Sequence, residues 1–122
     1  MARVALLSPD LLFGSKVEGA LALAGHDVAR FATAERFAVA VGFHDLAIFD
    51  LTAEGIDGAD LLHRLREHGD LPDGLPTLGY YSHVDIDTRR RALEAGFTKV
   101  VPRSRMAREA ATLAAGLLAG RG

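Results

Sequence analysis

Cysteine is absent from this 122-residue sequence, and long apolar runs are absent as well. The lack of cysteine excludes disulfides, zinc–thiolate sites, iron–sulfur clusters and cysteine catalysis. The apolar run that follows Met1-Ala2-Arg3 breaks at Ser8-Pro9-Asp10, so it is too short for a secretory signal or a membrane span. A surplus of positive charge is also lacking: the formal net charge is −2, which argues against nucleic-acid binding. We therefore expect a cytoplasmic protein that contacts neither membrane nor nucleic acid.

The charged residues are distributed unevenly along what we expect to be one globular domain, residues 1–122. Residues 44–73 include eight acids and two bases, whereas residues 83–108 include seven bases and three acids. One interpretation is that these charges lie on solvated helix faces. The other is a polarised surface that selects a partner.

Short apolar segments alternate with helical patterns along the whole chain. Five strands are predicted: Arg3–Leu7, His26–Phe31, Asp45–Asp50, Thr77–Tyr81 and Thr98–Val101. Apolar periodicity and capping signals predict five helices. The first is capped by Ser8, has Pro9 at its first position and ends at Gly25, and the second is Ala34–Val41, capped by Thr33. The third carries Leu61, Leu62 and Leu65 and ends at Gly69, the fourth runs from Asp87 or Thr88 to Ala95, and the fifth is Arg105–Ala119. This alternation predicts an α/β fold, a flavodoxin-like (βα)5 domain with a five-stranded parallel sheet of order 2-1-3-4-5 and helices on both faces.

In such a sheet, the functional site lies outside the carboxyl ends of the strands. The residues predicted there are Ser8, Pro9, Asp10, Asp50, Thr52, Ser82, His83, Pro102 and Arg103. Asp50 is the most distinctive of them, because it ends an apolar strand. Its carboxylate could accept a phosphoryl group, bind a metal or pair with a cation. Alternatively, Asp50 only caps the loop that follows it.

Four segments, in the order expected along the chain, carry a family resemblance. They are the run 45–62, in which Asp50 precedes a Gly-x-Asp-Gly loop (55–58); Gly79-Tyr-Tyr-Ser82-His83; Ala92-Leu93-Glu94-Ala95-Gly96-Phe97; and Thr33-Ala34-Glu35. Together they resemble the response-regulator receiver (CheY-like) family across essentially the whole chain. The resemblance implies that Asp50 is the phospho-acceptor and that Ser82 is the switch residue of the fourth strand.

The sequence departs from the receiver pattern at the first and fifth strands. Receivers carry two acids at the end of the first strand, which hold magnesium, but here those positions are Ser8 and Pro9. Asp10 is adjacent, and as a first-turn acid it is favoured by the helix dipole. Asp50 with the Thr52 carbonyl alone would be a poor magnesium site. The lysine of the family's fifth strand is replaced by Arg103, for which we hypothesise a salt bridge to Asp50.

Two more departures follow the fourth and fifth strands. Receivers have a small residue directly after the switch position, whereas here it is His83. One interpretation is a His83–Asp85 pair that shapes a ligand or partner site; the other is a loop histidine, with Asp85 near the start of the next helix. Ser104 replaces the family's proline after the lysine position. The supporting site residues are thus Ser8, Asp10, Thr52, Asp85 and Ser104.

These observations predict a stand-alone, degenerate receiver-like domain in two-component-type signalling that acts by binding a protein partner. The alternatives are a receiver phosphorylated at Asp50 with an unusual metal site, and a small-anion or ligand-binding module. We expect no enzymatic activity and no cofactor, with magnesium as the weaker alternative, because no P-loop or flavin phosphate loop is present. A homodimer is expected through the fourth helix, fifth strand and fifth helix, where basic residues cluster at 89–91 and 105–108.

Overall fold

A computed structural model describes residues 2–82 and 84–120 of the chain. Five parallel strands form one sheet in the order β2-β1-β3-β4-β5, which confirms the predicted topology. The strands are β1 (Arg3–Leu7), β2 (Asp27–Phe31), β3 (Leu46–Asp50), β4 (Thr77–Tyr81) and β5 (Lys99–Pro102). The bounds of β1 and β4 are those predicted, and the others shift by one residue.

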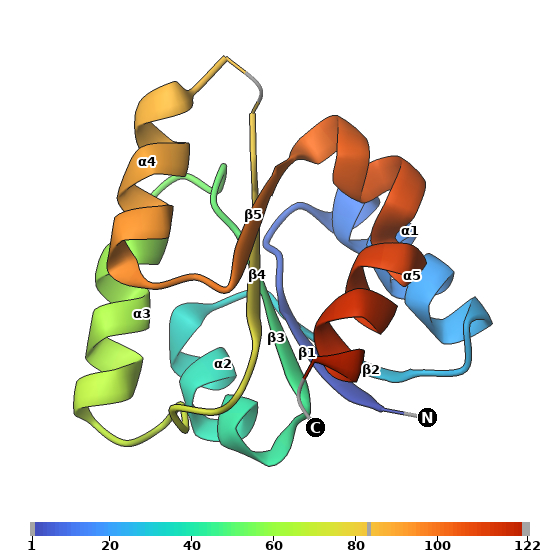
Figure 1. The fold of residues 1–122 in the computed structure, drawn as a ribbon, viewed down its shortest axis with the longest axis horizontal. Helices are drawn as coiled ribbons and strands as arrows, with labels where there is room; N and C mark the ends of the chain where they lie inside the picture. The colour runs from blue at the N-terminus through green and yellow to red at the C-terminus, as the bar shows by residue number, and fades with distance from the viewer. Residues whose placement is uncertain (1, 83, 121–122) are drawn as a thin grey trace.

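Helices cover both faces of the sheet. They are α1 (Leu11–Leu23), α2 (Ala34–Ala40), α3 (Gly58–Glu67), α4 (Ile86–Ala95) and α5 (Arg103–Ala119), with a short 3-10 helix, η1 (Val41–Phe43), after α2. Figure 1 shows α2, α3 and α4 on one side of the sheet and α1 and α5 on the other. The central strands β3 and β4 are buried along their whole length, as expected for a sheet between two helical layers.

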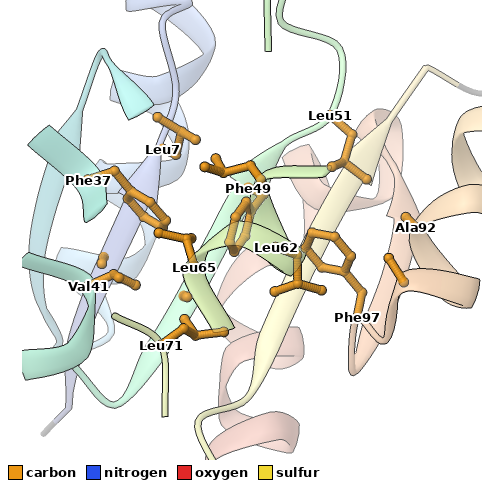
Figure 2. Close-up of a cluster of buried hydrophobic side chains, with 14 of the residues drawn as sticks. Leu7, Phe37, Val41, Phe49, Leu51, Leu62, Leu65, Leu71, Ala92 and Phe97 are labelled. Atoms are coloured by element: carbon orange, nitrogen blue, oxygen red, sulfur yellow. The ribbon is translucent and has the colours of Figure 1, made fainter. Parts of the chain in front are cut away.

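Each face of the sheet has its own hydrophobic core. Beneath α2, α3 and α4, the ring of Phe49 meets Phe37 on one side and Phe97 on the other, with centroids 5.0 and 4.9 Å apart in edge-to-face geometry (Figure 2). On the opposite face, Leu21 of α1 and Met106 of α5 belong to the second core. The two cores fix the helices relative to the strand ends that carry the polar residues.

Two helix starts differ from the prediction. Asp10, not Ser8, caps α1: its Oδ1 accepts a hydrogen bond from the Phe13 N–H at 3.0 Å. Ser8 instead continues the strand, because its N–H donates to the carbonyl of Phe31 at 2.9 Å. Likewise α4 starts at Ile86 rather than at Asp87 or Thr88.

Smaller shifts affect α2 and α5. The cap at Thr33 is confirmed, but α2 ends at Ala40 and the chain continues into η1. α5 begins at Arg103, two residues before the predicted start, with Pro102 at its N-cap. Proline fits this boundary because its fixed φ suits an extended residue that leads into a helix.

Candidate functional site

The polar residues predicted at the carboxyl ends of the strands do gather at one edge of the sheet. Asp50 is the last residue of β3 and only 2% exposed. The parallel register places Asp50 opposite Tyr80 of β4, and it pairs Phe49 with Leu7 of β1. Ser8, the residue after Leu7, is therefore the β1 neighbour of this strand end.

Thr52 holds the carboxylate of Asp50. The backbone N–H of Thr52 donates to Asp50 Oδ1 at 2.8 Å, and the Thr52 hydroxyl donates to the same oxygen at 2.6 Å. Because both donors come from two residues further along the chain, this is a local turn closed by the aspartate side chain. Capping the following loop, one of the alternatives for Asp50, is thus part of the observed geometry.

Ser8 lies in a buried network rather than at a free strand end. Its side chain is 0% exposed; Oγ accepts a hydrogen bond from the Tyr80 hydroxyl at 3.3 Å and donates to the carbonyl of Asp10 at 3.3 Å. Burial, and next the nearby negative charge of Asp50, raise the pKa of the Tyr80 phenol well above its ordinary value. Tyr80 therefore stays protonated and keeps donating to Ser8 at neutral pH.

Arg103 pairs with Asp10, so the hypothesised salt bridge between Asp50 and Arg103 is wrong. An Arg103 Nη donates to Asp10 Oδ2 at 2.9 Å, and the guanidinium carbon lies 4.2 Å from the centre of the Phe13 ring. No nitrogen–oxygen distance of 4.0 Å or less joins Arg103 to Asp50, both of which the structure describes. At the start of α1, Arg103 makes an ion pair with Asp10 and a cation–π contact with Phe13 at the same time, whereas Asp50 would offer only an ion pair.

Asp10 therefore has both carboxylate oxygens engaged. Oδ1 caps α1 and Oδ2 binds Arg103. The hydrogen bond from the Phe13 N–H is the main reason that the pKa of Asp10 lies below its ordinary value; desolvation opposes it, and the hydrogen bond from Arg103 lowers the pKa further. This acid is committed to joining α1 to α5.

The remaining predicted residues lie around this edge. Ser82 follows β4 and is partly exposed, and its carbonyl accepts from the N–H of Asp85 at 2.9 Å. Asp85 caps α4 by accepting a hydrogen bond from the Thr88 hydroxyl at 2.5 Å and another from the Thr88 N–H at 3.1 Å, and both lower the pKa of Asp85.

The predicted His83–Asp85 pair depends on His83, which lies outside the described residues. Ser104 is exposed on α5 and its carbonyl accepts from Arg108 Nε at 3.3 Å.

A second ion pair ties the loop after Asp50 to α4. Asp57 caps α3 by accepting from the Asp60 N–H at 3.1 Å, and its other oxygen accepts from Arg91 at 2.7 Å. The hydrogen bond from Arg91 is the main reason that the pKa of Asp57 is lowered. A cavity of 380 Å³ lies between this loop and α4, with Leu51, Ile56 and Thr88 in its wall.

Two contributors to the site, Tyr80 and Phe13, were not anticipated from the sequence. A signal for Tyr80 was present: a tyrosine inside an apolar strand must find a hydrogen-bond partner for its hydroxyl. Phe13 carried no comparable signal, because its role depends on an arginine that is ninety residues away in sequence. In residues 2–82 and 84–120, no cluster of three or more histidine, aspartate or glutamate side chains is arranged to hold a metal ion.

Comparisons with known proteins add the class of fold. No family model matches the chain, and no curated protein matches it. Among solved structures, a candidate response regulator from Chloroflexus aurantiacus superimposes with a TM-score of 0.83 at 26% identity, over 97% of this chain and 98% of its own. A CheY-like receiver domain from Methanospirillum hungatei gives 0.85 at 18% identity, over 99% and 96%.

NtrX from Brucella abortus, in complex with ADP, gives a TM-score of 0.86 at 20% identity and covers 98% of this chain, which spans only 27% of NtrX. The structural neighbours are thus CheY-like receiver domains, and this chain has the receiver-domain fold of two-component response regulators. None of the helices in the described part of the chain is long and apolar enough to cross a membrane.

Proposed function

We propose that this chain is a degenerate receiver that works in two-component-type signalling by binding a protein partner, without magnesium-dependent phosphorylation of Asp50. We propose in addition that it has no catalytic activity and needs no cofactor. The observation that carries the proposal is Ser8: a neutral side chain, fully buried and bonded to Tyr80, stands at the strand end where the receiver family has a metal-binding acid.

The residues around Asp50 do not fit a magnesium ion. Magnesium prefers near-octahedral oxygen ligands, commonly one or two carboxylates with water. The nearest acid in sequence to the end of β1 is Asp10, and its two oxygens are bound to the Phe13 N–H and to Arg103. Asp50 itself accepts two hydrogen bonds from Thr52 on one oxygen. We therefore derive no phosphoryl-transfer step.

The surface supports partner binding rather than chemistry. Arg89 of α4 and Lys99 of β5 form no ion pair with any residue that the structure describes, so they leave uncompensated positive charge on the face formed by α4, β5 and α5. The other bases of the predicted cluster are paired: Arg91 binds Asp57 beside α3, and Arg90, Arg105 and Arg108 pair with acids of their own helices. Exposed side chains of one sign steer and select partners of opposite charge. We expect this basic face, rather than the strand edge at Asp50, to meet the partner.

The test is a two-dimensional NMR titration of the labelled protein with magnesium and then with beryllofluoride, a mimic of the phosphoryl group. Asp50→Asn is the matched control, because it keeps the size of the side chain and removes its charge. We expect the amides of Asp50, Thr52 and Ser82 to move no more in the wild type than in this variant.

Two other results have definite meanings. Saturable shifts that require magnesium, beryllofluoride and an intact Asp50 would establish the phosphorylatable receiver and overturn the proposal. Shifts near Ser8, Ser82 and Arg103 on adding inorganic phosphate, equal in the wild type and in Asp50→Asn, would overturn it in favour of an anion-binding module.

A further inference from the structure

A groove separates α2 from α3 on the layer that contains α2, α3 and α4. Its volume is 680 Å³. Apolar side chains form its floor: Ala34, Ala38, Ile56, Leu61 and Leu65. They also belong to, or pack against, the core beneath this layer. The groove is thus an open continuation of the hydrophobic core.

The rim of this groove is acidic. It carries five carboxylates and one arginine, a formal net charge of −4: Glu35, Glu54, Asp57, Asp60, Asp70 and Arg64. Asp57 and Asp60 are neutralised locally by Arg91 and Arg64, at 2.7 and 3.0 Å. For Glu35, Glu54 and Asp70, no ion pair within 4.0 Å is made by any residue that the structure describes. Three carboxylates therefore remain available around an apolar floor.

The complementary surface lies on α4 of the same chain. Ile86, Arg89 and Leu93 follow one another at helical spacings of three and four, so they share one face of the helix. We call these three residues the α4 stripe. Ile86 is 71% and Leu93 41% exposed, and Arg89 is exposed with no ion pair to any described residue. The neighbouring Arg90 is already paired with acids of its own helix.

We propose that the α2–α3 groove of one copy binds the α4 stripe of a second copy. Ile86 and Leu93 would cover the apolar floor, and Arg89 would meet the unpaired carboxylates of the rim. The inference rests on the proposed function, because it names a partner for a module that acts through its surface.

This contact is head-to-tail. Groove and stripe are different patches, and α3 lies between α2, over β1 and β2, and α4, over β4 and β5 (Figure 1). One copy therefore cannot satisfy its own groove. A heterologous contact of this kind propagates into a ring or an open chain instead of closing as a two-fold dimer.

Charge argues against the symmetric alternative, the homodimer through α4, β5 and α5 that the sequence suggested. A two-fold interface places the same patch of both copies face to face. In that patch Arg89 and Lys99 form no ion pair with any described residue, whereas the arginines of α5 are paired with acids, so the uncompensated charges of the two copies would be alike. The acidic groove receives the same α4 face with opposite charge.

Sedimentation velocity tests the proposal, from about 10 µM to about 1 mM protein, where weak contacts become populated. In about 50 mM salt we expect species larger than a monomer that grow with concentration, and in about 500 mM salt we expect their loss. A groove variant, Glu35→Lys with Asp70→Lys, and a stripe variant, Arg89→Glu, should each weaken self-association at least about tenfold. Matched charge reversals outside both patches, Glu67→Lys on α3 and Lys16→Glu on α1, should leave it unchanged.

Mixing the two variants is the decisive step. The groove variant keeps its stripe and the stripe variant keeps its groove, so an equimolar mixture should form a heterodimer that grows no further. A monomeric wild type at every concentration would overturn the inference. So would a dimer that the stripe variant abolishes but that the groove variant leaves unaffected, because that pattern is the symmetric interface. Either result leaves the proposed function standing, since only the beryllofluoride titration decides the state of Asp50.

Discussion

The buried hydrogen bond from Tyr80 to Ser8 makes a quantitative prediction about stability. Ser8→Ala removes the acceptor and leaves the phenol hydroxyl of Tyr80 buried without a partner. Both side chains are 0% exposed, so solvent cannot replace the lost bond. Stranding a buried polar group costs about 1–3 kcal/mol of unfolding free energy.

Tyr80→Phe should cost less. It removes the donor, but Ser8 Oγ keeps its own donation to the carbonyl of Asp10. We expect a loss of about 0.5–1.5 kcal/mol, the usual net contribution of one neutral hydrogen bond. The double variant removes both polar groups, so it should be no less stable than Ser8→Ala alone. The coupling energy of the cycle should then be about 1 kcal/mol.

Urea unfolding at pH 7 of the wild type, the two single variants and the double variant measures this double-mutant cycle, with one denaturant dependence fitted to all four proteins. The dependence of the unfolding free energy on pH gives a second test. Because the pKa of Tyr80 is raised by folding, its contribution is intact below the unfolded value of about 10 and is lost as pH rises above it. Wild type should therefore lose stability in alkali faster than Tyr80→Phe. If the free-energy changes of the two single variants are additive, with a coupling energy below about 0.3 kcal/mol, the hydrogen bond from Tyr80 to Ser8 does not contribute to stability as predicted.

Two further predictions concern α1. A Cβ on Gly14 would lie 2.8 Å from the buried Oγ of Ser8, so Gly14→Ala should destabilise the protein by about 1–3 kcal/mol. A Cβ on Gly19, in the same helix, would meet nothing within 4 Å, so Gly19→Ala should stabilise the protein by about 0.5–1 kcal/mol. Thermal unfolding measures both variants, and a shift of the same sign in both would contradict this prediction. Asp10→Asn should lower stability at pH 7, and the difference from wild type should close in acid. The reason is that hydrogen bonding from the Phe13 N–H depresses the pKa of Asp10, so its ionised form stabilises the fold above pH 3.8 and ceases to do so as pH falls through the lower folded value. Urea midpoints measured between pH 2 and 7 check this, and a constant difference would exclude it.

The sequence was most informative where burial dominates. Thr77–Tyr81 was predicted residue for residue, because an apolar run between Pro76 and Ser82 has no alternative register. The strand order followed from the alternation of strands and helices, since parallel crossovers need intervening helices. These features depend on patterns that are local and repeated.

The sequence predicted which residues gather at the candidate site, but not which of them bind one another. Ser8 and Asp10 are both good helix caps, so local signals could not choose between them. The choice depends on a tertiary contact, the bond from the Ser8 N–H to the Phe31 carbonyl. Arg103 was assigned to Asp50 by analogy of position, but a long flexible side chain reaches whichever carboxylate and ring the packing of α1 offers.

The ion pair between Asp10 and Arg103 has a consequence for the order of folding. It joins the first helix of the chain to the last, and the core under α1 is completed by residues of α5 such as Met106 and Leu113. During synthesis α1 emerges early and can pack against β2, yet the part of its buried face that meets α5 gains its partners only after α5 has left the ribosome, as does the second carboxylate oxygen of Asp10. Part of the apolar face of α1 therefore stays uncovered on the nascent chain until α5 has been made and packs on it.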